Sequence, residues 1–495
     1  MIRTESGRYP SVILHVVGLT VLMTGIGEVV SAVVDMIKGG PDTAVLAGLG
    51  LATSIVGYLV WRTTEVPTRI RIADVFAVVV AAWIGLAVVG GLPYLATGTL
   101  SRPDDAIFEA VSGFTTTGAT VLRPIEGTGP GILFWRSLSQ WIGGMGVIVL
   151  VVAVLPTIGS GGMDLLQAEA PGPTGERLTP KVRHTARRLW GVYLLLTFVV
   201  IAGFLLGGMS IYDAVVHSFT TVSTGGFSPY NRSLGHFESA FIEWVAILGM
   251  FLAGGSFTLY YRAIRGSVGP LYRSVEFRLY LGAVLGSSAV CYLTNSDEFG
   301  YGHDAVRGTL FTVVSIVSTT GYATVDYEQW AEAAQIILLF LMPVGAMAGS
   351  TAGGVKYIRV LSVASYAWRD STPAPPRLVR PIRVGNNIVE EDVAARVAAF
   401  SSSHLRSSGP APSPLRSRAR TCGPRCRRRQ PRSATWVLAC LSSALPDDMR
   451  NLKPVARGIV IIEMLLGRLE IYPILLAFAA APRRLHVRRP SRISS

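Results

Sequence analysis

A short peptide of hydroxyl residues ending in glycine occurs three times in this chain, each time between strongly apolar segments. The copies are "SGFTTTGATVL" (112–122), "SFTTVSTGGF" (218–227) and "VVSIVSTTGYAT" (313–324). Aligned on Gly118, Gly225 and Gly321, each glycine follows a threonine and a further hydroxyl residue. Three such coincidences at one place in the chain predict an internal structural repeat.

The segments around these peptides are too apolar for a soluble protein. Half of the 495 residues are hydrophobic, 15% are charged, and the mean hydropathy is +0.45, so lipid must solvate most of the chain. A spanning helix needs about 20 apolar residues. The first candidate lacks a signal-peptide cleavage pattern, and further spans follow it at once. We expect spans near 11–36, 43–61, 73–98, 131–156, 189–208, 238–261, 277–293, 333–348 and 457–481.

The basic residues are distributed unevenly between alternate loops. Lys and Arg number three to six in each of the loops 62–72, 176–188, 262–278, 356–383 and 483–492, against one or two in each of 37–42, 99–130, 209–240 and 294–308. This asymmetry follows the positive-inside rule. It predicts cytoplasmic termini and places the three hydroxyl-rich peptides on the outer side. The net charge of +14 is thereby explained by topology, and we expect no nucleic-acid partner.

Each hydroxyl-rich peptide follows a short amphipathic stretch, at 105–114, 212–222 and 308–318. The repeating unit is therefore a helix, a half-length helix, a polar loop and a second helix. Irregular backbone at membrane depth is tolerated only where it is buried in protein or lines a water-filled path. A half-helix entering from outside points its negative carboxyl end at the membrane interior.

Such loops can bind a cation through their backbone. Carbonyl oxygens can replace the hydration shell of a weakly hydrated monovalent ion, K⁺ above all, and glycine supplies the φ angles that other residues avoid. The alternative is that the Thr/Gly peptides are surfaces for close helix packing, which membrane helices also use. Three matched copies on one side of the membrane favour the ion-binding interpretation.

Further motifs give the chain a family resemblance. They are "FWRSLSQWIGGMGVIVL" (134–150), "QAEAPGPTGERLTP" (167–180), "FRLYL" (277–281), "AGSTAGGVKYIRVL" (348–361) and "EMLLGRLEIYP" (463–473). The chain resembles the TrkH/KtrB (Trk/Ktr/HKT) superfamily of potassium uptake proteins. That resemblance implies four helix–pore-loop–helix repeats around a central pore and two extra amino-terminal helices. It also implies K⁺ sites at the backbone carbonyls of Thr116, Thr117, Gly118, Ser223, Thr224, Gly225, Thr319, Thr320 and Gly321.

The expected fold is an all-α polytopic membrane protein. We divide it into an amino-terminal helix pair, four pore repeats and a basic cytoplasmic tail, at 1–70, 71–160, 186–266, 275–370, 385–482 and 483–495.

The glycine-rich segment "GAMAGSTAGGVK" (345–356) interrupts an apolar helix. Each glycine weakens a helix by about 1 kcal/mol relative to alanine, so the segment should unwind near the middle of the membrane. It is not a phosphate-binding loop, because Val355 and Tyr357 break the Gly-Lys-Ser/Thr pattern. The resemblance implies an intramembrane barrier below the filter, involving Gly349, Gly353, Gly354 and Lys356.

Arg468 lies within the apolar segment 459–480, with Glu463 and Glu470 nearby. A charge at that depth costs at least about 2.5 kcal/mol, so it should face a cavity or a partner. One interpretation is an Arg–Glu pair that joins helices. The other, which the resemblance favours, is a cation below the filter that limits leak.

We expect other polar residues near the repeats to support the half-helices and not to bind the ion themselves. Asp105, Asp213 and Asp304 are expected to cap the half-helices or to concentrate cations at the mouth. His217 is expected to pack in its half-helix, since no second metal ligand stands near it in the sequence.

The fourth repeat is disrupted. Its filter should fall near 420–440, yet 401–446 is rich in Arg, Pro and Ser and contains Cys422, Cys426 and Cys440. A disordered insert is one interpretation, and a metal site lacks a second ligand pair. We favour an out-of-frame segment, because a one-base shift with chosen codons turns Ser401–Ser403 into Phe-Phe-Phe. The same shift yields Asp-Leu-Gly-Pro-Gly-Leu from 435–440, which resembles the family's fourth filter.

Two functions follow from these patterns. The first is K⁺ uptake driven by the membrane potential or by a coupled ion; the second is a non-conducting or decayed protein of the same fold. The resemblance implies a homodimer on a cytoplasmic nucleotide-binding regulatory subunit (TrkA/KtrA-like). Such a subunit would dock on the basic loops 176–188 and 262–278, unless these loops merely obey the topology rule. The sequence contains no enzyme constellation, and we expect no bound cofactor, with K⁺ as the transported ion.

Overall fold

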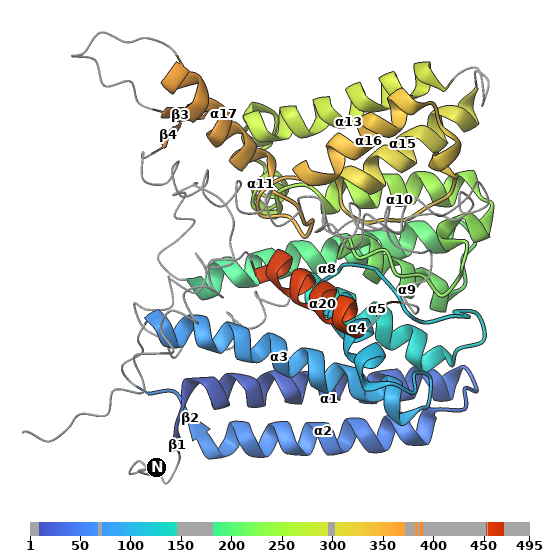
Figure 1. The fold of residues 1–495 in the computed structure, drawn as a ribbon, viewed down its shortest axis with the longest axis vertical. Helices are drawn as coiled ribbons and strands as arrows, with labels where there is room; N and C mark the ends of the chain where they lie inside the picture. Colours follow the sequence, from blue (N-terminus) through green and yellow to red (C-terminus); the bar gives the residue numbers. More distant parts are fainter. Residues whose placement is uncertain are drawn as a thin grey trace, which may run out of the picture.

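The structure is a computed structural model that describes residues 9–67, 72–145, 182–295, 302–371, 382–384, 387–389, 452 and 454–469. It is mostly helical, as predicted, and the long helices lie side by side with their axes nearly parallel (Figure 1). Two short strand pairs are the exceptions: β1 (Tyr9–Pro10) pairs in parallel with β2 (Thr64–Glu65), and β3 (Ile382–Val384) pairs antiparallel with β4 (Asn387–Val389).

Three long helices form the layer at the amino-terminal edge of the molecule: α1 (Val12–Ile37), α2 (Thr43–Thr63) and α3 (Ile72–Ala96) (Figure 1). Their bounds match the predicted spans to within a few residues. Glycines bring α1 against α2, since a Cβ added at Gly25 would lie 2.5 Å from the Ser54 amide nitrogen and one at Gly50 would lie 2.8 Å from that of Val29. Small residues permit this close approach of membrane helices.

The three predicted units follow in order along the chain. The first contains α4 (Pro103–Phe114) and α5 (Pro130–Gly144). The second contains α8 (Val182–Leu206), α9 (Ile211–Val222), the 3₁₀ turn η3 (Ser233–Phe237) and α10 (Ala240–Ala253). The third contains α13 (Val275–Thr294), α15 (His303–Val317), η4 (Tyr327–Gln329) and α16 (Glu332–Val344). After these come α17 (Tyr357–Ser371) and α20 (Pro454–Leu469).

Among the described residues, five helices are long and apolar enough to cross a membrane: α1, α2, α3, α8 and α13. Apolar side chains point outward from them; Leu51, Ile55 and Phe198 are 57%, 58% and 66% exposed. Such surfaces are stable only against lipid, and large exposed apolar patches are rare on soluble monomers. The chain is therefore a multi-pass membrane protein.

The span expected at 238–261 is not one straight helix. The chain bends by 101° between α10 and α11 (Phe257–Ile264), and the short α12 (Gly269–Arg273) follows. The bend lies at Gly254 and Gly255, where the Gly254 carbonyl accepts a hydrogen bond from the Met347 amide at 3.0 Å. Hydropathy does not register this bend because both arms are apolar.

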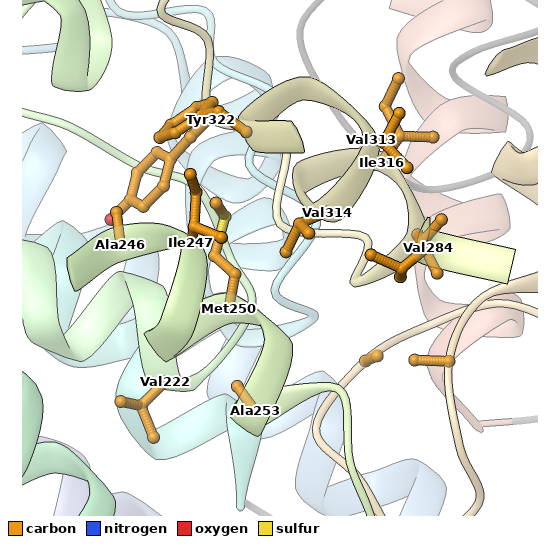
Figure 2. Close-up of a cluster of buried hydrophobic side chains, with 14 of the residues drawn as sticks. Val222, Ala246, Ile247, Met250, Ala253, Val284, Val313, Val314, Ile316 and Tyr322 are labelled. Atoms are coloured by element: carbon orange, nitrogen blue, oxygen red, sulfur yellow. The ribbon is translucent and has the colours of Figure 1, made fainter. Parts of the chain in front are cut away.

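The buried core lies behind the polar loops. Figure 2 shows side chains of α10, α13 and α15, among them Met250, Val284 and Val314, gathered in one apolar cluster with the Tyr322 ring beside α10. A second cluster joins α3, α4 and α5 around Trp83, Phe114 and Trp135. The half-helices are thus enclosed by protein on their apolar faces.

Several expectations lie outside the described residues. They are the continuation of the span 131–156 beyond residue 145, the disrupted segment 401–446, Glu470, and the tail 483–495. Of the fourth repeat, α20 is the part that the structure describes as a helix.

Candidate ion pathway

The three half-helices end in the same backbone turn. Their last helical positions are followed by residues with positive φ, at Thr116 (56°), Thr224 (54°) and Thr319 (59°). Two residues later a glycine with positive φ follows each: Gly118 (79°), Gly226 (76°) and Gly321 (79°). In each loop, the amide of the residue between this threonine and this glycine donates to the carbonyl five residues back, as in Thr117 to Ser112 and Thr320 to Ser315, both at 2.9 Å. The three loops therefore share one conformation.

This geometry corrects the alignment of the second loop by one residue. Gly226, not Gly225, occupies the place of Gly118 and Gly321, and Gly225 occupies the place of Thr117 and Thr320. Two adjacent glycines made the sequence ambiguous, and the residue after the glycine (Phe227, against Tyr322) was the available signal. The Gly225 carbonyl accepts a hydrogen bond from Gln140 Nε2 at 2.8 Å, and Gln140 Oε1 accepts one from the Phe227 amide at 3.1 Å.

The hydroxyl groups of the loops bond mainly within their own loop. Thr115 and Thr117 share a hydrogen bond of 2.7 Å, and Ser318 and Thr320 share one of the same length. The half-helix serines close the loops, since Ser112 donates to the Ala119 carbonyl at 2.5 Å and Ser315 to the Tyr322 carbonyl at 2.7 Å. All hydroxyl residues predicted as ion-site residues are buried: Thr116, Thr117, Ser223, Thr224, Thr319 and Thr320.

The loops lie against one another. Gly226 touches the third loop so closely that an added Cβ would overlap the Thr320 carbonyl oxygen. The Tyr322 hydroxyl reaches the second half-helix, where it donates to the His217 carbonyl at 3.1 Å and contacts the hydroxyls of Thr220 and Thr221. The first loop adjoins the second, because a Cβ at Gly113 would lie 3.6 Å from the Phe227 ring. Segments about 100 residues apart are thus brought together.

The segment 345–356 is unwound, as predicted. α16 ends at Val344 and α17 begins at Tyr357. Between them, positive φ angles occur at Gly345, Gly349, Gly354 and Lys356. Gly353 has an ordinary φ; its amide donates to the Thr319 hydroxyl at 2.7 Å, which attaches this loop to the third hydroxyl-rich loop.

Arg468 lies between that loop and the end of α5. Its guanidinium donates to the Gly143 and Gly144 carbonyls at 2.7 and 3.1 Å and to the Thr351 carbonyl at 3.2 Å. A guanidinium can serve several acceptors at once through its fixed fork of donors. Carbonyl oxygens therefore stabilise this cation, while Glu463 is half-buried on the same helix.

The three aspartates lie near the half-helix starts but are not the capping residues, since the N-cap positions are Arg102, Ser210 and Gly302. Asp105, Asp213 and Asp304 each lie in a first helical turn. Asp105 forms an ion pair with Arg457 of α20. Burial alone would raise the pKa of the neighbouring Asp104, but Arg102 and Arg457 beside it lower that pKa overall.

His217 is fully buried, as its predicted packing role requires. One ring nitrogen lies 2.8 Å from the Asp213 carbonyl oxygen and the other lies 3.2 Å from Ser228 Oγ. The ring stacks on Tyr230. The described part of the chain holds no cluster of three or more metal-ligating side chains.

Comparison with known proteins gives this arrangement a family. A family model described as "Cation transport protein" (TrkH) matches residues 42–282 and 300–402, well over half of the chain. The chain belongs to the TrkH family. The Trk system potassium uptake protein TrkH of Halomonas elongata is 31% identical, over 95% of this chain and 98% of that protein. Its namesake in Escherichia coli is 32% identical, over 94% and 98%.

A solved structure extends the likeness to the fold. The potassium transporter TrkH from Vibrio parahaemolyticus aligns with a TM-score of 0.78 and 30% sequence identity, covering 94% of this chain and 97% of that chain. Members of this family are transporters and not enzymes. The family match ends at residue 402, two residues into the segment that the sequence sets apart as aberrant.

Sequence reasoning missed a buried ion pair behind the loops. Glu109 of α4 and Arg136 of α5 are 2.8 Å apart, with side chains 0% and 2% exposed. The Glu109 carboxylate also accepts from the Thr120 hydroxyl at 2.8 Å. Arg136 donates to the Ser228 carbonyl at 3.3 Å and stacks on the Phe227 ring at 4.1 Å. Arg136, the one charged residue in the sequence of α5, was the signal available in the sequence.

Proposed function

We propose that the chain carries K⁺ across the cytoplasmic membrane, through a pore lined by the backbone carbonyls of its hydroxyl-rich loops. The proposed ion-site residues are those of the sequence analysis, with Gly226 added to the second loop. One observation carries the proposal: three loops with the same sequence of φ angles lie in contact at the buried ends of three half-helices. The names of the relatives, potassium uptake proteins, agree with it.

The chemistry supports K⁺ over a divalent or small cation. Carbonyl dipoles can replace the loosely held water of K⁺, whereas a strongly hydrated ion loses too much on dehydration. The half-helix carboxyl ends add a partial negative charge at the same point. The hydroxyl pairs Thr115–Thr117 and Ser318–Thr320 hold the turns in shape from within the loops.

We further propose that the segment 345–356 is a barrier on the path below the loops. Gly349, Gly353 and Gly354 give it a backbone that can rearrange, and the cationic groups of Lys356 and Arg468 oppose the passage of K⁺ by charge repulsion. The three hydrogen bonds of Arg468 support a closed conformation, since they join this loop to the end of α5.

The proposed setting is a homodimer in the cytoplasmic membrane, with both termini in the cytoplasm. A cytoplasmic nucleotide-binding regulatory subunit (TrkA/KtrA-like) would dock on the basic loops 176–188 and 262–278. The exposed residues Arg265, Tyr272 and Arg273 of the basic loop 262–278 support this proposal.

The alternative is a non-conducting protein of the same fold. It follows from the sequence 401–446, which supplies no fourth filter as written. The family-model match ends at residue 402, two residues into this segment, whereas the alignment with the Halomonas elongata relative covers 95% of the chain.

Uptake of Rb⁺ by a K⁺-uptake-deficient bacterium that expresses this chain separates the two. Conduction predicts uptake that Gly118→Ala abolishes. Gly98→Ala is the matched control, because Gly98 has a similar positive φ (70°) and open space at its Cβ position, so this variant measures the backbone cost alone. Absence of uptake by the parent chain would support the alternative. The gene sequence across 395–450 then decides whether a pair of compensating base changes brackets the segment.

A further inference from the structure

The loop 345–356 is held near both of its ends by a carboxylate from a different helix. Glu276 lies in the first turn of α13. Its Oε1 accepts hydrogen bonds from the Ala348 amide at 2.7 Å and from the Ile358 amide at 3.3 Å. These two donors are ten residues apart, one within the loop and one in the first turn of α17. A single oxygen therefore fastens both ends of the loop to α13.

The contact is favourable for two physical reasons. The first amides of a helix lack partners within it, so Ile358 needs an external acceptor. The amino-terminal end of a helix also carries a partial positive charge that favours a carboxylate. The Lys356 ammonium adds an electrostatic attraction to Glu276. The 2.7 Å bond from Ala348 has the length of a charge-assisted hydrogen bond, and the 3.3 Å bond from Ile358 is the longer and weaker of the two.

The attachments of this loop lead to several elements. Thr351 donates to the Val222 carbonyl at 2.9 Å and Gly353 donates to Thr319, so two contacts lead toward the hydroxyl-rich loops. The Met347 amide donates to the Gly254 carbonyl at 3.0 Å and the Phe257 amide donates to the Gly349 carbonyl at 3.1 Å, so two others lead to the bend between α10 and α11. Glu276 instead follows directly after α12, an exposed segment in which Tyr272 is 65% exposed. Glu276 lies three residues after the end of α12, so a displacement of α12 would act directly on the turn that carries it.

We propose that Glu276 is the positioning residue that latches the loop 345–356 in its closed conformation, and that movement of α12 releases it. Whether Glu276 holds the loop closed does not depend on the proposed function, whereas the effect of the latch on ion flow rests on it. Release frees the amides of Ala348 and Ile358 together, which loosens the loop at both ends in one step.

Amide hydrogen exchange of the purified chain in lipid nanodiscs tests the latch without requiring conduction. Glu276→Ala should speed exchange in the peptides covering 346–358 by about tenfold, the factor expected from loss of a charged hydrogen bond. Exchange in α9 and α15 should stay at the parent rate. Glu332→Ala is the matched control, a first-turn glutamate of α16 with an exposed side chain. Unchanged protection of 346–358 in Glu276→Ala would overturn the proposal.

Glu276→Gln keeps an acceptor oxygen without the charge and should restore part of the protection. It decides the question if the alanine variant does not fold, because parent-like exchange in the glutamine variant would show that the charge does not hold the loop. Rb⁺ flux in proteoliposomes then links the latch to transport. Glu276→Ala should raise basal flux several-fold with the K⁺-over-Na⁺ preference unchanged. Faster exchange in a chain that conducts no Rb⁺ would support the latch and reject the proposed function. Rb⁺ flux together with unaltered exchange would support the proposed function and reject the latch.

Discussion

Two kinds of irregular backbone lie within the membrane-embedded part of this molecule, and they are stabilised differently. The hydroxyl-rich loops are closed mainly by their own residues, as in the pairs Thr115–Thr117 and Ser318–Thr320, with Gln140 of α5 as an added support of the second loop. The segment 345–356 is attached through Glu276, Arg468 and Thr319, all of which belong to other elements. Buried backbone groups must find partners in either case.

The difference separates a fixed part from a releasable part. A loop whose bonds are internal keeps its shape when its neighbours move. A loop whose bonds lead to several other elements can change conformation when any one of them shifts. This is the distinction that an ion filter and a gate require, because selectivity depends on fixed oxygen positions whereas gating depends on displacement.

The largest expected effect concerns the support behind the fixed part. Glu109→Ala leaves Arg136 as an unpaired charge in the interior, which costs about 3–5 kcal/mol. The thermal unfolding temperature of the detergent-solubilised protein should fall sharply. The matched control is Glu238→Ala, which breaks an exposed pair with Arg232 (side chains 70% and 68% exposed) and should change stability by less than about 1 kcal/mol. Equal shifts in the two variants would refute a bracing role for Glu109.

The second effect tests the register of the second loop. Gly226→Ala combines a positive φ with an overlap on the Thr320 carbonyl oxygen, and the left-handed conformation alone costs about 1–2 kcal/mol. Rb⁺ uptake should fall more than tenfold. Gly225→Ala would crowd the Gln140 side-chain amide, but Gly225 has no positive φ, so its loss should be smaller. A greater loss in Gly225→Ala would restore the alignment that the sequence suggested.

That pair of glycines marks the limit of what the sequence could predict. Spans, half-helices and the unwound segment follow from hydropathy, amphipathic period and glycine content, which are local properties. The choice between Gly225 and Gly226 depends on contacts with Gln140 and the third loop, which lie far away in sequence. Local patterns cannot encode such a choice when both residues are glycine.

Long-range polar contacts were hidden for the same reason. In the sequence, Glu276 is an ordinary acidic residue in the first turn of α13. Its attachment to the loop 345–356 depends on amides more than 70 residues away. The bend after α10 was also missed, because α10 and α11 together pass as one span by mean hydropathy despite the glycines between them. Arg468 was different, since a lone cation in an apolar segment is unfavourable enough to indicate an intramembrane partner.

The third effect concerns the releasable part. Arg468→Ala removes hydrogen bonds to Gly143, Gly144 and Thr351 and takes a positive charge away from the proposed path. Basal Rb⁺ flux in proteoliposomes should rise several-fold. Arg468→Lys keeps the charge but loses the fork of donors, and should give an intermediate flux. If both variants conduct less than the parent chain, the guanidinium supports the pore and does not obstruct it.

The smallest effect is expected from two matched variants, one in each kind of loop. Ser315→Ala removes the bond that closes the third hydroxyl-rich loop, and Thr351→Val removes the bonds from the segment 345–356 to the Val222 and Ala253 carbonyls. Each change costs about 1 kcal/mol, so overall stability should fall by similar amounts. Their consequences for transport should differ. Ser315→Ala should lower the preference for Rb⁺ over Na⁺, because its bond fixes the oxygens of the loop itself. Thr351→Val should leave that preference intact and speed amide exchange in 346–358. The same change in ion preference from both variants would mean that the two loops act as one rigid unit.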